Sequence, residues 1–235
     1  MEIDSVSDMI LLETRDQSDK KVHFSSISLE TGKIHFEALE TEERWLAGIE
    51  AAHNGVLLLH NYQSESGPAH KGLITIDETT GEVLWRNFNS AFDQLTINGP
   101  LLYDTRFQPK RLVLTDIRTG ATIRSYEPSI DLELAYELGF PEVASDEFAL
   151  SLHLPVHPLE NTVQYLEHSN RIIVSLHAIT GDELQQHLYM MRGTDVIYHD
   201  LLAAGIQKLQ PESFIIHKDQ LIYLVNHSQL KVLNL

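Results

Sequence analysis

The sequence predicts an all-β protein made of repeated four-stranded antiparallel sheets. The first observation is a Thr-Gly dipeptide that occurs four times, each time between two strand-like stretches. The second observation is a tight turn that recurs upstream of each Thr-Gly unit, between two apolar strands. The third is the composition, because 43% hydrophobic and 22% charged residues in a chain of 235 are typical of a packed globular protein.

Each Thr-Gly unit is typical of a β-hairpin turn. A short polar side chain at the first turn position accepts hydrogen bonds from backbone amides two residues on. The glycine takes the positive φ that ends a type I turn with a bulge. Asp or Ser occupies the first position in three units, and His177 occupies it in the fourth. The units span residues 28–32, 77–81, 116–120 and 177–181.

The upstream turns complete a four-strand unit. His53-Asn54-Gly55 precedes one apolar strand and Ile97-Asn98-Gly99 precedes another, with comparable turns at 6–8 and 217–219. The order is strand, tight turn, strand, variable loop, strand, Thr-Gly turn, strand. Four antiparallel strands in about 40 to 50 residues are typical of a β-propeller blade.

We therefore expect a single small β-propeller domain over residues 1–235, with five blades of up to four strands, and with four or six blades as alternatives. The expected blades are 1–40, 45–87, 93–127, 145–191 and 212–235. The last has no Thr-Gly turn and so lacks its outer strand, which the N-terminus could supply. Helix-like spacings at 129–139 and 200–209 predict one or two short helical insertions, with irregular strands as the alternative.

One segment carries a more specific pattern, an Asp, then Thr-Gly, then a Trp four residues after the glycine. Asp77, Thr80, Gly81 and Trp85 form it. This resembles the repeat of quinoprotein-type (PQQ-like) β-propellers, and the chain looks closest to small uncharacterised bacterial propellers. The resemblance implies that Trp85 packs between neighbouring blades. Because the chain has room for about five blades, fewer than the quinoprotein dehydrogenases use to enclose their cofactor, we carry over neither quinone binding nor dehydrogenase activity and expect no cofactor.

Composition excludes several classes of protein. The net charge of −17 argues against nucleic acid and against an anionic membrane surface as partners. The absence of cysteine excludes disulfide scaffolds, thiol catalysis and zinc ribbons. The N-terminus has neither the basic nor the apolar region of a signal peptide, and no apolar run approaches the length of a membrane span. We expect a cytoplasmic monomer.

The candidate ligand site is the mouth of the central channel. His53 and His217 stand at the ends of predicted innermost strands, and Glu50 and Asp93 lie on or near equivalent strands. Polar groups that converge there would form a ligand site. The alternative is that these residues satisfy turn amides or face solvent.

The histidine pair at 153 and 157 is a weaker candidate. Pro155 and the alternating pattern argue for an extended stretch, on which the two imidazoles would lie about 13 Å apart, too far for one ion. We therefore expect no metal site. Common catalytic and nucleotide-binding motifs are absent, so no catalytic residue is identified.

Two functions remain. The favoured one is a non-catalytic binding or scaffold module that presents variable loops to a protein or peptide partner, or to a small molecule. The alternative is a hydrolase of sugars or lactones in the central channel, with a carboxylate pair or a divalent metal as its catalytic groups.

Overall fold

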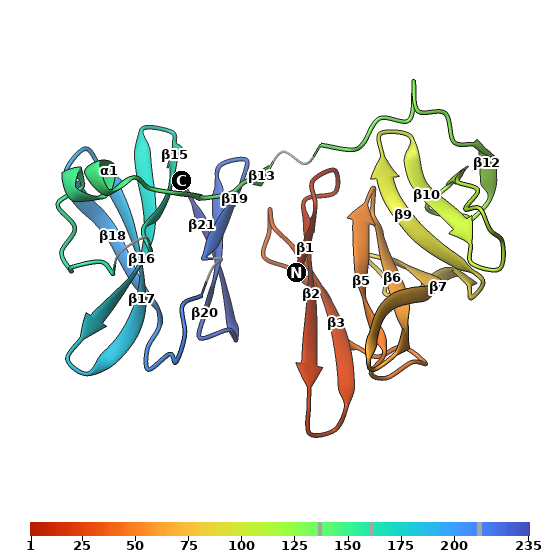
Figure 1. The fold of residues 1–235 in the computed structure, drawn as a ribbon, viewed down its shortest axis with the longest axis horizontal. Coiled ribbons are helices and arrows are strands. Elements are labelled where there is room, and N and C mark those ends of the chain that lie inside the picture. Colours follow the sequence, from red (N-terminus) through yellow and green to blue (C-terminus); the bar gives the residue numbers. More distant parts are fainter. Residues whose placement is uncertain (136–137, 160–161, 211–212) are drawn as a thin grey trace. The chain divides into compact units, whose positions relative to one another are not determined.

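The computed structural model is all-β and describes residues 1–135, 138–159, 162–210 and 213–235 (Figure 1). The chain divides into two compact units, Met1–Tyr136 and Glu137–Leu235, which are called unit 1 and unit 2 below. Five antiparallel sheets carry the strands, and one short helix, α1 (Asp146–Ser151), occurs among the described residues. In this described part, every helix falls short of the length and apolar character needed to cross a membrane.

Unit 1 contains three four-stranded sheets, each formed by strands that are consecutive in the sequence. The first sheet consists of β1 (Glu2–Asp4), β2 (Met9–Asp16), β3 (Lys21–Ser28) and β4 (Ile34–Leu39). The second consists of β5 (Ala47–His53), β6 (Val56–Ser64), β7 (Gly67–Asp77) and β8 (Val83–Asn87). The third consists of β9 (Ser90–Thr96), β10 (Gly99–Asp104), β11 (Val113–Thr115) and β12 (Thr122–Ser125). The first two sheets fall within the predicted repeats 1–40 and 45–87, whereas the third begins at Ser90, three residues before the predicted start at 93.

Unit 2 contains two sheets. The fourth sheet consists of β14 (Glu142–Val143), β15 (Gln164–His168), β16 (Arg171–Thr180), β17 (Glu183–Arg192) and β18 (Asp195–Ala203). The fifth consists of β13 (Leu138–Gly139), β19 (Phe214–His217), β20 (Gln220–Val225) and β21 (Gln229–Asn234). Residue 212, the expected start of the last repeat, lies outside the described residues.

The extra strand of the fifth sheet is β13, which pairs with β19. The prediction that the N-terminus would supply it is wrong, because that segment forms β1 and pairs with β2 in the first sheet. The strand β13, which precedes the fourth sheet in the sequence, covers the edge of the fifth sheet at β19 instead.

The helices expected at 129–139 and 200–209 do not form among the described residues, and the alternative of a strand is confirmed for 200–203. Residues 200–203 complete β18 and pair with β17, and the chain then bends without forming a helix. The described part of 129–139 is irregular apart from β13, while residues 136 and 137 lie outside the described ranges. The helix that does form, α1, begins after Ser145, whose hydroxyl accepts a hydrogen bond from the Phe148 amide.

The Thr-Gly turns of unit 1 have the predicted geometry. Oδ1 of Asp77 accepts hydrogen bonds from the amides two and three residues on, at 3.0 Å each, and Gly81 has a φ of 75°. The turn at 116–120 repeats these bonds. The fourth unit differs, because β16 and β17 stay paired up to the glycine and His177 lies inside β16.

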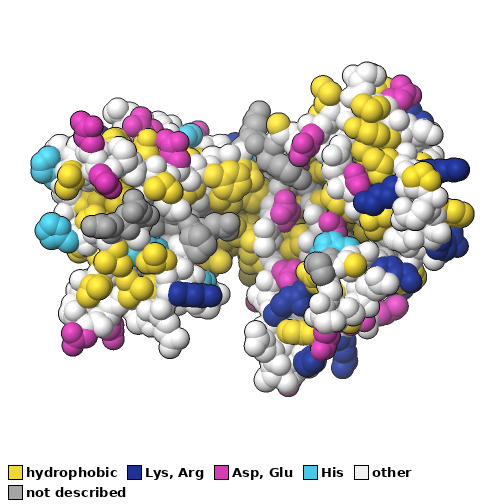
Figure 2. All heavy atoms as spheres, viewed as in Figure 1, with side chains coloured by type: hydrophobic (Ala, Val, Ile, Leu, Met, Phe, Trp, Pro, Cys, Tyr) yellow, Lys and Arg dark blue, Asp and Glu magenta, His cyan; other side chains and the backbone are white. Residues whose placement is uncertain are grey.

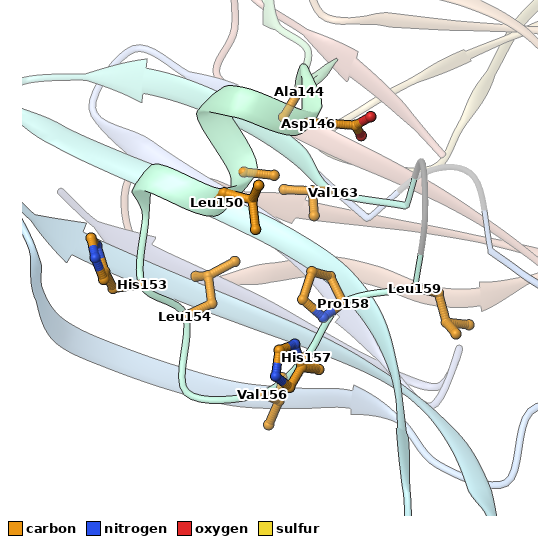
Figure 3. A pocket seen from close by; sticks show the side chains of 11 residues that line it. Ala144, Asp146, Leu150, His153, Leu154, Val156, His157, Pro158, Leu159 and Val163 are labelled. Carbon is orange, nitrogen blue, oxygen red and sulfur yellow. The ribbon is translucent and has the colours of Figure 1, made fainter.

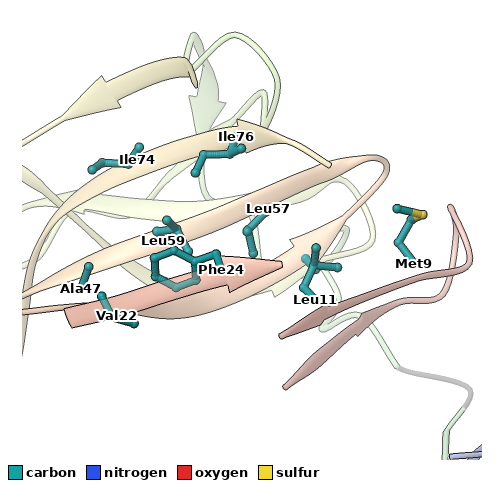
Figure 4. Packing of buried hydrophobic residues seen from close by; sticks show 10 residues of the cluster. Met9, Leu11, Val22, Phe24, Ala47, Leu57, Leu59, Ile74 and Ile76 are labelled. Carbon is teal, nitrogen blue, oxygen red and sulfur yellow. The ribbon is translucent and has the colours of Figure 1, made fainter. Parts of the chain in front are cut away.

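Apolar faces of consecutive sheets pack together. In unit 1 the side chains of β2 and β3 meet those of β5, β6 and β7 in one buried cluster (Figure 4). Trp85 extends from the second sheet to the third, where its Nε1 donates to the Ile117 carbonyl at 2.8 Å. Its ring lies against Gly120, whose added Cβ would come within 2.8 Å of it. Trp85 thus has the inter-sheet position expected from the sequence.

Candidate metal centre

The candidate centre lies on three adjacent strands of the second sheet. Glu50 comes from β5, His60 from β6 and His70 from β7. One carboxylate oxygen and two imidazole nitrogens lie within 4.8 Å of one another. Within the described ranges, this is the one place where three side chains of metal-ligating type come together so closely.

A bulge in β7 places His70. The ladder between β6 and β7 is regular up to His60 and then skips one residue of β7, so that Tyr62 is opposite His70. Without the extra residue, Lys71 would be opposite Tyr62. Gly72 has a φ of 85°, a conformation that L side chains rarely adopt. Gly72 therefore allows the bulge, which places His70 and not Lys71 opposite Tyr62.

A second bulge places Glu50. In the ladder between β5 and β6, Ile49 pairs with Leu59 and Ala51 pairs with Leu58, so Glu50 is the extra residue. Bulges change the direction of side chains and are frequent beside functional sites. Two bulges in one sheet thus bring the three ligand-type groups together.

The Glu50 carboxylate contacts both imidazoles. Its Oε2 is 2.9 Å from Nδ1 of His60 and 2.8 Å from Nδ1 of His70. The two imidazole rings stack, with centroids 3.6 Å apart and planes 5° from parallel. Tyr62 meets both rings edge-on, at 4.6 and 5.1 Å between centroids. The His60 side chain is 4% exposed and the His70 side chain 32%, so the site opens to solvent at His70.

His60 is buried without a hydrogen bond. Neither of its ring nitrogens has a hydrogen-bond partner among the described residues, since the short contact with Glu50 lacks hydrogen-bond geometry. A buried polar group left in this state costs about 1–3 kcal/mol. Gly48 lies directly against the ring, and a Cβ there would come within 2.9 Å of Nε2. The fold thus makes room for an imidazole that carries an unused lone pair.

Two charged residues of β2 hold the edge of β5 beside this centre. Oε2 of Glu13 accepts a hydrogen bond from the Ile49 amide at 2.9 Å. The Arg15 guanidinium donates to the carbonyls of Trp45 and Ala47 at 2.9 and 2.6 Å, and it pairs with Glu13 at 2.7 Å. These contacts attach the strand that carries Glu50 to the first sheet.

The four residues predicted to form one ligand site lie on β5, β9 and β19, with three residues in unit 1 and one in unit 2. Glu50 joins the histidine pair, whereas His53 lies three residues further on, at the turn into β6. Asp93 of β9 pairs with Lys110 at 3.5 Å. His217 ends β19 in unit 2 and is buried. A common channel mouth for these four residues stays a prediction.

His153 and His157 follow α1 and line an apolar hollow of unit 2 (Figure 3). Neither residue lies in a strand. Figure 3 shows the two imidazoles on separate stretches of the loop.

His60 and His70 were not predicted as ligands from the sequence. The sequence pattern predicts a variable loop between them, whereas the structure has a continuous hairpin that turns between Ser64 and Gly67. A hairpin centred there brings residues near 60 opposite residues near 70. Recognition of this turn is the signal that would have paired the two histidines.

Comparison with known proteins finds one partial match to a family model and no activity. A family model described as a domain of unknown function (DUF4905) matches residues 3–85. The matched segment covers the first sheet and the second as far as Trp85, and it includes Glu50, His60 and His70. No curated protein matches the chain. The function therefore has to be inferred from the geometry.

Proposed function

We propose that the second sheet binds a divalent transition-metal ion through Glu50, His60 and His70. The observation that carries the proposal is the buried His60, which has no hydrogen bond within the described residues and stacks on a second imidazole beside a shared carboxylate. Two imidazoles and one carboxylate form the ligand set of protein sites for Zn²⁺ or Fe²⁺ that keep a coordination position open.

The dimensions of the site fit such an ion after a small adjustment. Bonds of about 2.0–2.1 Å in tetrahedral geometry separate the ligand atoms by about 3.3 Å. The contacts from Glu50 to the imidazoles are 2.8 and 2.9 Å, so they would lengthen by about half an ångström. The ion would also neutralise the Glu50 carboxylate and use the free lone pair of His60. Solvent reaches the site at His70, which gives the ion its access.

Titration of the full chain with Zn²⁺ and Co²⁺ tests the proposal. We expect one ion per chain and a rise of several degrees in the unfolding midpoint, since a ligand at 100 times its Kd stabilises by about 2.7 kcal/mol. His70→Ala should abolish the rise. His53→Ala is the matched control on the same sheet and should retain it. A shift that survives both substitutions would overturn the proposal, because it would come from other histidines among the 13 in the chain.

Metal-assisted hydrolysis is a second candidate function. Three protein ligands leave a position on the ion for water, and bound Zn²⁺ lowers the pKa of that water to about 7. This favours the hydrolase hypothesis from the sequence in the form that uses a divalent metal, and not a carboxylate pair, as the catalytic group. Activated esters, lactones and aryl glycosides are the substrates to assay, with Glu50→Gln as the inactive control. If the metal binds and none of these turns over, the centre is a binding site only.

We further infer that the five sheets are the blades of a small propeller. Support comes from the consecutive strand order within unit 1 and from the cores shared by the first and second, second and third, and fourth and fifth sheets. A compact chain of 235 residues should have a radius of gyration of about 18 Å in small-angle scattering. A clearly larger radius would contradict a closed ring.

We also propose that the loops between the strands bind a protein or peptide partner. Acidic and basic side chains are interspersed over the face of unit 1 visible in Figure 2, so that face offers no basic patch for nucleic acid. Affinity capture at low salt tests the proposal. Reproducible capture of one partner supports it, and a clean, partner-free result counts against it.

A further inference from the structure

Two buried carboxyl groups meet where the first and second sheets join. Asp4 ends β1 and Glu78 follows β7, and both residues are 0% exposed. Both side chains bond to Ser7, since Asp4 accepts from its amide at 3.4 Å and Glu78 from its hydroxyl at 2.9 Å, so the two carboxyl groups are neighbours. Because two neighbouring buried carboxylates repel each other and lack solvation, this arrangement favours a proton on one of the two groups.

Asp4 is occupied as an acceptor of backbone amides. Its Oδ1 accepts hydrogen bonds from Val6 and Ser7 at 2.9 and 3.4 Å. Its Oδ2 accepts one from Gly55 at 2.8 Å. Gly55 belongs to the turn between β5 and β6, so Asp4 links a turn of the first sheet to a turn of the second. This role uses lone pairs on both carboxylate oxygens.

Glu78 is anchored at the same junction by its backbone. Its amide donates to the Gly55 carbonyl at 3.1 Å, and its carbonyl accepts a hydrogen bond from Ser26 Oγ at 2.6 Å. In the side chain, Oε2 accepts a hydrogen bond from Ser7 Oγ at 2.9 Å, whereas Oε1 has no donor among the described residues. An ionised Glu78 would leave this oxygen bare and buried. A protonated Glu78 can donate to Asp4.

The neighbouring charges act in the same direction. Burial, followed by the adjacent Asp4 carboxylate, raises the pKa of Glu78 to about 8, and Asp77 adds to the effect. Arg118 from the third sheet approaches this junction at Gly55, but its guanidinium pairs with the Asp77 carboxylate at 3.0 Å. The charged groups that face Glu78 from β1, from its own turn and from the third sheet are thus Asp4, Asp77 and the already paired Arg118.

We propose that Glu78 is a pH-sensitive clasp, which holds the second sheet to the first while protonated and releases it when the proton leaves. None of the metal ligands takes part, so the test of the clasp is independent of the test of the metal centre. The folded state keeps a proton that an unfolded Glu loses near its ordinary value of 4.5. Between that pH and about 8 the folded state binds more protons, so the stability of unit 1 falls as the pH rises.

Denaturant unfolding of the full chain between pH 5 and pH 9 tests the clasp. Both tryptophans, Trp45 and Trp85, lie in unit 1, so their fluorescence reports on that unit. The wild-type unfolding constant should rise with pH, by at most about tenfold per unit. Glu78→Gln should remove this component, because the amide stays neutral and keeps a hydrogen for Asp4. Glu82→Gln, an exposed carboxylate of the same turn, is the matched control and should keep the wild-type slope.

Equal slopes for the wild type and Glu78→Gln would overturn the proposal. If that variant does not fold, carboxyl ¹³C NMR of the wild type decides, because the clasp requires one Glu carboxyl that titrates near pH 8. A spectrum in which every Glu titrates below about pH 6 would contradict it. Metal binding at pH 6 should be unchanged in Glu78→Gln, so failure of either proposal is recognised separately.

Discussion

The second and fourth sheets both stack histidines from neighbouring strands, but among the described residues only the second adds a carboxylate. In the second sheet, Glu50 contacts both His60 and His70. In the fourth, the rings of His187 and His199 lie 5.4 Å apart, and Nδ1 of His187 is 3.1 Å from Nε2 of His199. One imidazole can donate to the other there, while Nε2 of His187 has no hydrogen-bond partner among the described residues. The comparison indicates that a histidine pair alone is not enough for a metal site. The Glu50 carboxylate, which the bulge in β5 places beside the pair, completes the ligand set.

Replacement of Glu50 by glutamine should have the largest effect. Glutamine keeps the size but removes the charged ligand, so we expect the Zn²⁺ affinity to fall by at least about a hundredfold, the upper end of what an outer-shell loss costs. Isothermal titration at pH 7 measures the change. His199→Ala is the control in the fourth sheet and should bind like the wild type. Equal losses in both variants would mean that the carboxylate does not distinguish the two clusters.

Replacement of Gly72 by alanine should have the next largest effect. Its φ is 85°, and a Cβ would lie 3.3 Å from Phe88 Cδ1 and 3.4 Å from Phe88 Cα. Because the latter is backbone, we expect a loss of about 1–3 kcal/mol in unfolding free energy and a displaced His70. Urea unfolding and the metal-induced shift report the two effects.

Gly193 in the fourth sheet is the matched control for this substitution. Its φ is 59°, and a Cβ there meets nothing within 4 Å. Gly193→Ala should therefore cost only the conformational strain, about 1 kcal/mol, and leave the metal shift intact. A Gly72→Ala variant with wild-type metal affinity would refute the role of the bulge.

The smallest effect should be an acid sensitivity of unit 2. Burial, and then the neighbouring His199, lowers the pKa of His187, and burial lowers the pKa of His177. Unfolded histidine binds a proton near its ordinary value of 6.5, while these folded ones bind it only at lower pH. Their contribution to stability is therefore present above pH 6.5 and is lost as the pH falls below it. Unit 1, through Glu78, should weaken in the opposite direction.

Hydrogen exchange of the β17 amides measures this sensitivity locally. His187→Phe removes one titrating ring and should reduce the loss of protection in acid. His53→Ala, in unit 1, should leave it unchanged. A His187→Phe variant with the wild-type acid profile would contradict the assignment.

The parts of the fold that the sequence predicts correctly are those determined by local turn chemistry. Asp77 and Gly81 form the predicted hairpin because the side chain and the positive φ act within five residues, and Trp85 packs on the next such turn. The prediction of helices is wrong because contacts between distant residues outweigh the local pattern. At 200–209 the apolar spacing suits a helix, but pairing with β17 takes residues 200–203 as strand. Tertiary hydrogen bonding decided that segment.

The candidate centre was predictable only in part. Glu50 was singled out from the sequence, but for a channel mouth with His53 and not for its true neighbours. Its partners are fixed by two bulges, one at Glu50 and one beside Gly72. A shift of one residue reverses the face of a side chain, and no local sequence pattern fixes where such a shift occurs. His60 and His70 can therefore be identified as candidate ligands only from the strand register of the second sheet.

X-ray absorption spectroscopy at the zinc edge tests the metal centre most directly. The sample is the full chain with one equivalent of Zn²⁺, beside His70→Ala prepared in the same way. We predict two imidazoles and one carboxylate at about 2.0–2.1 Å in the wild type, and the loss of one imidazole in the variant. An identical spectrum for the two proteins, or a coordination sphere without imidazole, would contradict a metal centre at Glu50, His60 and His70.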